Sequence, residues 1–338
     1  MCAMAPHQTL PRRLRPVIPS LLVALLAATG CSGGSSPGPE APVAVFPAVA
    51  THEYGQTVVE EAPERVVSLG YTDQDAILAL GTVPVAIREF TGNRPSATWP
   101  WAADKLKGEQ PAVLPAGDVT PEAVAELEPD LIVAITANLT REQYDAYSKI
   151  APTIAAPLNT KDDVVSWADA TKLTGTALGL PGEADRLISD VEEKFVEVEE
   201  NHPELAGATV ALARPNPADS ASVVAWSSND LRGQFLKELG VQVPAQVDRL
   251  AGDGAFATMP SDQLPTLDDA DALVVAGTPA EQAAFAALPG YGQLKLVQES
   301  KVVTLDDEQS AALAFGSVLS LPAVADEVAG RLARAVGR

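Results

Sequence analysis

The sequence predicts an α/β fold with two lobes, each a mainly parallel sheet flanked by helices, joined by one long helix. Short apolar runs alternate with helical segments over residues 65–150, and this alternation resumes over residues 209–335. Residues 162–203, between the two stretches, show helical spacing only. A repeated strand-helix-strand order implies a parallel sheet covered by helices on both faces.

The elements of the first lobe follow from apolar spacing and turn residues. Val58 and Val59, preceded by Tyr54-Gly55, indicate a short hairpin before the sheet. Thr140 is the expected N-cap of a helix, because its hydroxyl can accept a hydrogen bond from the first turn. We expect strands at 65–69, 83–87 and 130–135, and helices at 75–80, 121–128 and 140–150.

The middle of the chain separates the two lobes. Asp162–Gly179 places apolar side chains at helical spacing, and a second helix follows Pro181 and ends at Pro203. We assign the connecting helix to the first of these segments. Strands are then expected at 209–213, 272–276 and 302–305, with helices at 229–239, 280–288 and 322–335. The predicted folded parts are an N-terminal lobe at 45–160, a connecting helix at 161–180 and a C-terminal lobe at 181–338.

The first 30 residues have the pattern of an export signal. A basic segment precedes an apolar run from Val17 to Ala28, which is too short to cross a bilayer of about 30 Å as a helix. Thr29-Gly30 before Cys31 resembles the lipobox of bacterial lipoproteins, in which the cysteine is diacylated. We expect a lipoprotein signal peptide at 1–30 and a flexible tether at 31–44, with a plain secretory cleavage site as the alternative.

This leader predicts an exported protein, lipid-anchored to the outer face of the cytoplasmic membrane. Export by the general or the twin-arginine route is left open by Arg12-Arg13. Cys2 leaves with the leader, so the mature chain would keep Cys31 alone and form no internal disulfide. Core size would then have to stabilise the exported domain.

The charge balance argues against a nucleic-acid-binding role. The chain has 23 Lys and Arg against 45 Asp and Glu, a formal net charge of −22. Neutralising phosphates requires clustered basic residues. The densest basic run, Arg12, Arg13 and Arg15, lies in the leader.

An internal near-repeat is the most informative feature of the folded part. Residues 121–133 place Glu122 in the first turn of a helix, which is followed by a buried strand. Residues 261–275 repeat this arrangement with Asp262, one extra residue near Asp269 breaking the register. Acidic residues favour first turns through the helix dipole alone. Their occurrence once per lobe suggests a paired role.

Several segments together resemble one family of binding proteins. Over residues 45–335 the chain looks like the iron-siderophore branch of ABC-importer substrate-binding lipoproteins, and more distantly like the cobalamin- and haem-binding members. The resemblance rests on the order and spacing of residues 65–75, 98–102, 139–144, 149–153, 305–307 and 319–322.

This resemblance implies a ligand held between two lobes that close only slightly. It implies that Glu122 and Asp262 dock onto an ABC permease. Asp262 stands where the family usually has Glu, and Pro265 one turn later removes a backbone donor, so the second docking helix is expected to be short or displaced. The expected cargo is a ferric siderophore bound by a monomer. No cofactor is expected, and iron enters only as part of the siderophore.

A ferric siderophore calls for aromatic walls and convergent donors, often arginine. Arg88 and Arg214 each end a strand, where ligands gather in open α/β sheets. Alternatively, either arginine could hold a local carboxylate. Trp99 and Trp101 could instead cap the first lobe. The predicted ligand-binding residues are Tyr71, Arg88, Trp99, Trp101, Arg214, Trp226 and Tyr291.

We expect binding rather than catalysis. His52 and His202, the histidines beyond the leader, are not placed for chemistry. The sequence has no Gly-x-Ser-x-Gly elbow, phosphate-binding loop or His-Glu-x-x-His helix. A carboxylate-pair hydrolase stays open because acids are abundant. Two alternatives remain: cobalamin or haem as cargo, for which Tyr71 is a possible axial ligand, or a surface lipoprotein without a transport role.

Overall fold

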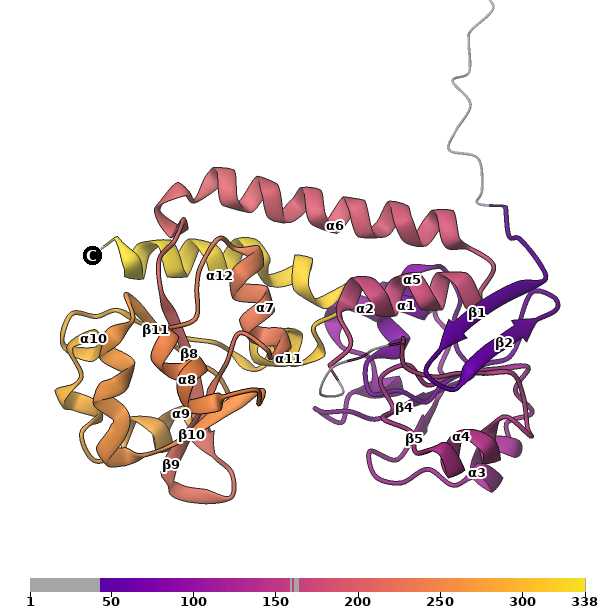
Figure 1. Cartoon of the computed structure of the whole chain (residues 1–338), viewed down its shortest axis with the longest axis horizontal. Coiled ribbons are helices and arrows are strands. Elements are labelled where there is room, and N and C mark those ends of the chain that lie inside the picture. The colour runs from indigo at the N-terminus through magenta and orange to yellow at the C-terminus, as the bar shows by residue number, and fades with distance from the viewer. Residues whose placement is uncertain (1–42, 159, 161–163, 338) are drawn as a thin grey trace, which may run out of the picture. The chain divides into compact units, whose positions relative to one another are not determined.

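The structure of the chain, a computed structural model, describes residues 43–158, 160 and 164–337 (Figure 1). The predicted signal peptide, the predicted lipidation site at Cys31 and most of the predicted tether lie outside these residues. None of the helices in the described part is both long and apolar enough to cross a membrane.

The N-terminal lobe contains a five-stranded sheet in which every pair of neighbours is parallel. The strand order is β5-β4-β3-β6-β7, with bounds Ala112–Leu114, Ala86–Arg88, Val66–Ser68, Leu131–Val133 and Thr153–Ile154. The predicted hairpin is present as β1 (Ala48–His52) and β2 (Gly55–Val59). The helices are α1 (Asp73–Ala79), α2 (Pro100–Ala103), α3 (Pro121–Ala125), α4 (Arg141–Tyr147) and α5 (Trp167–Ala177), with 3₁₀ turns at Pro95–Ala97 and Asp104–Leu106.

The strand order places a topological switch point between β3 and β6. The chain leaves β3 toward β4 on one side of the sheet and leaves β6 toward β7 on the other. Ligands of open α/β sheets bind outside the carboxyl ends of the strands at such a point. The loops after β3 and β6 are therefore the first place to look for a site.

The C-terminal lobe contains a second five-stranded sheet, in the order β10-β9-β8-β11-β12. Its strands are Phe256–Pro260, Asp219–Trp226, Val210–Asn216, Ala272–Val275 and Val302–Thr304. The strand β9 is antiparallel to both of its neighbours, whereas β8, β11 and β12 are parallel. The switch point lies between β8 and β11. The helices are α7 (Leu231–Glu238), α8 (Ala245–Ala251), α9 (Pro279–Ala286), α10 (Lys295–Gln298), α11 (Asp307–Phe315) and α12 (Ser320–Val336), with 3₁₀ helices at Pro203–Leu205, Ser261–Asp269 and Tyr291–Gln293.

The connecting helix is α6 (Pro181–Asn201), not the segment at 161–180 that the sequence analysis selected. In Figure 1, α6 is the long helix along the top of the view. Its first turns contribute Ala184 to the core of the N-terminal lobe, and its later turns contribute Val191 and Phe195 to the core of the C-terminal lobe. The helix α5 instead packs with the hairpin and the first sheet.

The chain breaks between α5 and α6 at Gly179, whose φ is +70°. A Cβ there would lie 2.6 Å from the ring of Phe46, so glycine is required by both conformation and space. Pro181 then begins α6. Its lack of an N–H costs no hydrogen bond there, because the first N–H groups of a helix have no acceptor within the helix. Apolar residues have helical spacing on both sides of this break. Periodicity alone therefore could not show which of the two helices connects the lobes.

Candidate functional site

Tyr71 and Arg88 lie together at the carboxyl edge of the first sheet, as the sequence analysis expected of strand ends. Tyr71 follows β3 and Arg88 ends β4. The Arg88 guanidinium carbon lies 4.0 Å from the centre of the Tyr71 ring, and Nη2 donates to the Tyr71 hydroxyl at 2.9 Å. The ring is half-buried, whereas Arg88 is only 7% exposed.

The other hydrogen bonds of Arg88 are made by Nη1 and Nη2 to backbone carbonyls of its own lobe, whereas its buried Nε has no hydrogen-bond partner. Nη2 also donates to the carbonyl oxygens of Ala116 and Gly117, at 3.1 and 2.9 Å, and Nη1 approaches the Leu69 carbonyl at 3.4 Å. Arg88 thus ties the loop after β5 to the loop after β3. Arg88 also holds the Tyr71 side chain in place, through the hydrogen bond to its hydroxyl and the contact with its ring.

Asp73 fixes the two loops of the switch point, a role that the sequence analysis missed. Its carboxylate accepts hydrogen bonds from the amides of Ile135 and Thr136, at 2.8 and 3.0 Å, and from the Thr136 hydroxyl at 2.7 Å. Burial raises the pKa of Asp73 to about 6, and these hydrogen bonds oppose that rise. A Cβ on Gly70 would lie 2.0 Å from its Oδ2. The sequence does carry a signal for this role: an acidic residue begins a helix three residues after a glycine.

Trp99 and Trp101 belong to an aromatic cluster between the lobes. The two indoles stack at 5.2 Å with an interplanar angle of 4°. Trp101 meets Phe315 of α11 edge-on at 5.2 Å, and Phe315 meets Phe90 in the same way. Trp99 is 2% exposed, so its indole packs under the surface rather than walling an open site. Phe90 and Phe315 were not foreseen, because their neighbours come from distant parts of the chain.

Two polar contacts join the lobes beside this cluster. The buried carboxylate of Asp75 in α1 accepts a hydrogen bond from Trp101 Nε1 at 2.9 Å and another from the hydroxyl of Ser317, which lies between α11 and α12. Arg94 pairs with Asp307 at 3.1 Å. The Arg94 guanidinium also lies 4.2 Å from the centre of the Trp99 ring. Both contacts involve residues that sequence reasoning did not select.

Arg214 lies on the carboxyl side of β8, next to the switch point of the second sheet. Its Nη2 is 3.6 Å from a carboxylate oxygen of Glu281 in the first turn of α9. The other oxygen of Glu281 accepts from the Thr278 amide at 2.8 Å and so caps α9. Arg214 and Tyr71 thus occupy corresponding edges of the two sheets.

Trp226 and Tyr291 are not brought to these edges. Trp226 ends β9, which is antiparallel to β8, so it lies within the sheet, one residue past the Ala213–Ala225 pair and beside Phe256 at the start of β10. It is buried in the lobe core beneath Arg232, whose guanidinium is 4.5 Å from its ring. Tyr291 packs edge-on against Phe285, at the border of one core cluster of the C-terminal lobe. The unforeseen direction of β9 explains the placement of Trp226.

Glu122 and Asp262 occupy equivalent exposed positions, one on each lobe. Each follows the carboxyl end of a strand, β5 and β10 respectively, in the first turn of a helix. Thr120 caps α3 by accepting from the Ala123 amide at 3.3 Å. The second helix is a 3₁₀ helix that contains Pro265. It has nine residues against five in α3, so it is not the shorter of the two helices, and it differs from α3 in being 3₁₀ rather than α-helical. A pocket of about 420 Å³ lies beside Asp262.

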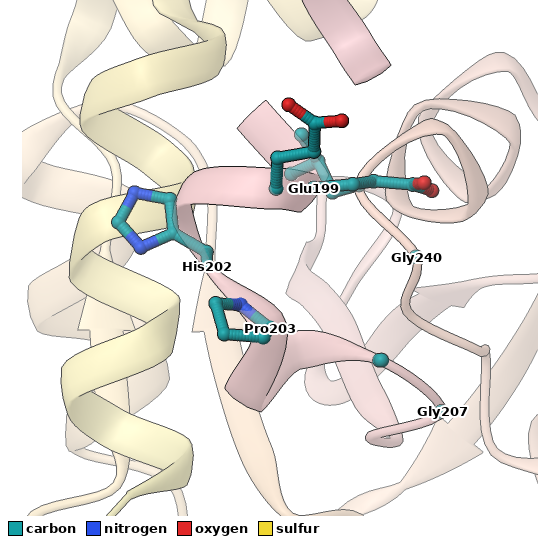
Figure 2. A pocket seen from close by; sticks show the side chains of 8 residues that line it. Glu199, His202, Pro203, Gly207 and Gly240 are labelled. Atoms are coloured by element: carbon teal, nitrogen blue, oxygen red, sulfur yellow. The ribbon is translucent and has the colours of Figure 1, made fainter. Parts of the chain in front are cut away.

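The histidines beyond the leader and a carboxylate-lined pocket lie elsewhere. A pocket of about 360 Å³ at the end of α6 is lined by Glu199, Glu200 and His202, among others (Figure 2). Figure 2 shows the His202 ring directed toward the yellow helix α12. His52 is buried in the hairpin, where its Nε2 lies 2.8 Å from the Thr57 hydroxyl. Within the described residues no cluster of His, Cys, Asp and Glu is arranged to hold a metal ion.

The fold and its two edges are those of a bilobal solute-binding protein. Residues 66–309 match the family described as periplasmic binding protein, and the chain belongs to this family. A Bacillus subtilis (strain 168) relative named "Probable siderophore-binding lipoprotein YfiY" is 29% identical over 223 residues, which is 63% of this chain and 62% of that protein. The match therefore spans under two thirds of that relative's length.

Solved structures extend the similarity over most of the chain. A periplasmic solute binding protein from Mycobacterium smegmatis superposes with a TM-score of 0.78 at 33% identity, covering 86% of this chain and 99% of that one. PiaA from Streptococcus pneumoniae TIGR4, in complex with ferrichrome, gives a TM-score of 0.73 at 26% identity with the same coverage. The two lobes and the connecting helix are thus shared with solute-binding proteins.

Proposed function

We propose that this protein captures a ferric siderophore outside the cytoplasm and delivers it to an ABC importer. The observation that carries the proposal is the similarity, over 86% of the chain, to a binding protein solved with ferrichrome. The placement of side chains supports it, because the rings of Tyr71 and Phe90 lie 5.7 Å apart at the carboxyl edge of the first sheet, where ligands of such folds bind. No chemistry on the ligand is part of the proposal, and iron is cargo rather than a resident cofactor.

The residues proposed to contact the ligand come from both lobes. On the first lobe they are Tyr71 and Phe90, whose rings lie 5.7 Å apart, with Arg88 behind Tyr71. On the second lobe Arg214 occupies the corresponding edge. Trp99 and Trp101 contribute indirectly by fixing the aromatic cluster between the lobes.

Tryptophan-fluorescence titration of the purified protein tests the binding proposal. Ferric siderophores, haem and cobalamin are added in turn, each siderophore also in its iron-free form. Saturable quenching at submicromolar concentration by a ferric siderophore, absent with the iron-free form, is the expected result. Quenching by haem or cobalamin alone would transfer the assignment to that cargo. No response to any of them would refute the binding proposal.

Glu122 and Asp262 are proposed to dock on the permease. Both are exposed carboxylates at the start of a helix and have no ion pair among the described residues. Replacing both with alanine should lower siderophore-dependent iron uptake about tenfold or more, since paired interfacial charges lose several kcal/mol when truncated. The dissociation constant for the siderophore should not change.

Matched variants separate docking from a general loss of charge. Glu126→Ala and Asp269→Ala each remove an exposed carboxylate from the same two helical segments and should leave uptake unchanged. Weakened siderophore binding in the Glu122→Ala, Asp262→Ala protein would show that these residues belong to the ligand site instead.

We also propose that Cys31 carries a lipid that holds the protein at the outer face of the cytoplasmic membrane. Support comes from the residues before Cys31 and from the word lipoprotein in the name of the Bacillus relative. Cys31→Ser should release the protein from the membrane fraction. Retention of this variant in washed membranes would contradict the anchor.

A further inference from the structure

We propose that the cargo is a ferric chelate without net negative charge, of the trishydroxamate class, and this rests on the proposed function. The cations that would pair with an anionic ligand are those that follow the carboxyl ends of the strands, where the ligand is expected. In the described part of the chain these are four arginines, and each already has partners of its own: Arg88, Arg94, Arg141 and Arg214.

Three of these arginines are neutralised by a carboxylate. Arg94 pairs with Asp307 at 3.1 Å, and its guanidinium is also held over Trp99. Arg214 lies 3.6 Å from Glu281. Arg141 pairs with Asp145 at 3.1 Å, one turn along α4. None of the three presents an unpaired positive charge to a ligand.

Arg88 has no carboxylate partner, but its donors are turned inward. Nη2 is shared among the Tyr71 hydroxyl and two backbone carbonyls, and the side chain is nine-tenths buried. The next residue, Glu89, is equally buried, and its Oε1 has no hydrogen-bond partner. Burial raises the pKa of Glu89. A raised pKa favours the neutral form of Glu89, so the charge of Arg88 is held by the Tyr71 hydroxyl and the two backbone carbonyls that occupy Nη2, which turn it away from an anion at the edge.

Further carboxylates at the carboxyl edges of the two sheets add negative charge, which disfavours an anionic ligand. Asp118 lies exposed in the loop after β5, directly after Gly117, whose carbonyl accepts from Arg88. Asp306 follows β12 and caps α11 through the Gln309 amide at 2.8 Å. The described edges thus hold more carboxylates than arginines.

The three common siderophore chemistries differ in charge. Three hydroxamate groups, each a monoanion, balance the charge of ferric iron, whereas three catecholates leave the complex triply negative, and ferric citrate complexes are also anionic. Enclosing an anion without a cation to pair with it is unfavourable, because its lost hydration is not replaced. A neutral or cationic trishydroxamate avoids that cost and can still pack its chelate ring against the rings of Tyr71 and Phe90.

Titration calorimetry of the full protein with ferrichrome, ferrioxamine, ferric enterobactin and ferric citrate tests this inference. Both hydroxamates should bind about 100-fold more tightly than either anionic chelate. Tighter binding of enterobactin or citrate would overturn the inference while leaving the proposed function intact. Absence of binding by all four would refute the inference and the proposed function together.

A charge variant tests the reason for the selectivity. Glu281→Gln should free Arg214 while keeping the cap of α9, since glutamine can serve in a capping box. Affinity for ferric citrate should then rise about tenfold, with ferrichrome affinity unchanged. Glu299→Gln is the matched control, because it removes the same charge from a pair with Lys301 at 3.4 Å before β12, on the opposite side of the sheet. Equal effects of the two variants would show that net charge, not Arg214, sets the selectivity, and would overturn the proposed cause.

Discussion

Replacing Asp75 by asparagine is expected to raise the free energy of unfolding at pH 7 by about 3 kcal/mol and to leave it nearly unchanged at pH 4. The Asp75 carboxyl group is 1% exposed, and burial raises its pKa to about 6 from an ordinary 3.8. The hydrogen bonds from Ser317 and Trp101 favour the ionised form but do not cancel the effect of burial.

The sign follows from proton binding. Between about pH 4 and pH 6 the folded protein holds a proton on Asp75 that the unfolded chain has released, so stability falls as the pH rises through this window. Above pH 6 the ionised carboxylate keeps the fold less stable by a constant amount. Asparagine is uncharged and keeps an oxygen that can accept from Trp101, so it removes this dependence.

Urea denaturation of both proteins at pH 4 and pH 7 measures the effect. Asp104→Asn, at an exposed position, is the control and should change stability by less than about 0.5 kcal/mol at either pH. A loss of stability at pH 7 would show that the ionised carboxylate stabilises the interlobe contact, and the same change at both pH values would show that ionisation of Asp75 is not the cause.

The second large effect is expected for Gly70→Ala, which should lower the free energy of unfolding by about 3 kcal/mol. The new methyl group would lie 2.0 Å from Asp73 Oδ2 and 2.3 Å from its carboxyl carbon. Asp73 would have to move, and the buried amide of Ile135 and that of Thr136 would lose their acceptor. The loops of the first switch point would shift, so siderophore affinity should fall as well.

A double-mutant cycle isolates the cause. In an Asp73→Ala background Gly70→Ala should cost much less, because the clashing carboxylate is gone. Gly117→Ala, in another edge loop with no atom within 4 Å of the added Cβ, is the matched control and should be well tolerated. Additive losses in the cycle would refute the assigned clash.

The fold was predictable where one periodic pattern sufficed. The parallel strands β3, β6, β11 and β12 are short apolar runs between helices, and the sequence analysis found each of them. It overlooked β9 and β10, because a hairpin that turns back within one sheet does not follow the strand-helix alternation. The same omission misplaced Trp226.

The sequence predicted where some residues of the site lie, but not which residues they contact. Arg88 and Arg214 could be placed because each follows an apolar run; Arg88 ends β4, whereas Arg214 lies two residues before the end of β8. Their partners could not, because the Gly117 carbonyl and the Glu281 carboxylate come from other elements. Phe315 reaches the tryptophans from a helix that the sequence analysis did not foresee. Contacts made in three dimensions decide which arginines keep a free charge.

Uptake of radioactive iron supplied as a ferric trishydroxamate tests the central claim most directly. Cells that lack this chain should lose most of the uptake. Expression of the intact chain should restore it, whereas the Glu122→Ala, Asp262→Ala protein should not. Uptake that is unchanged without the chain, in cells with no second hydroxamate importer, would contradict a role in siderophore import and favour a surface lipoprotein without a transport role.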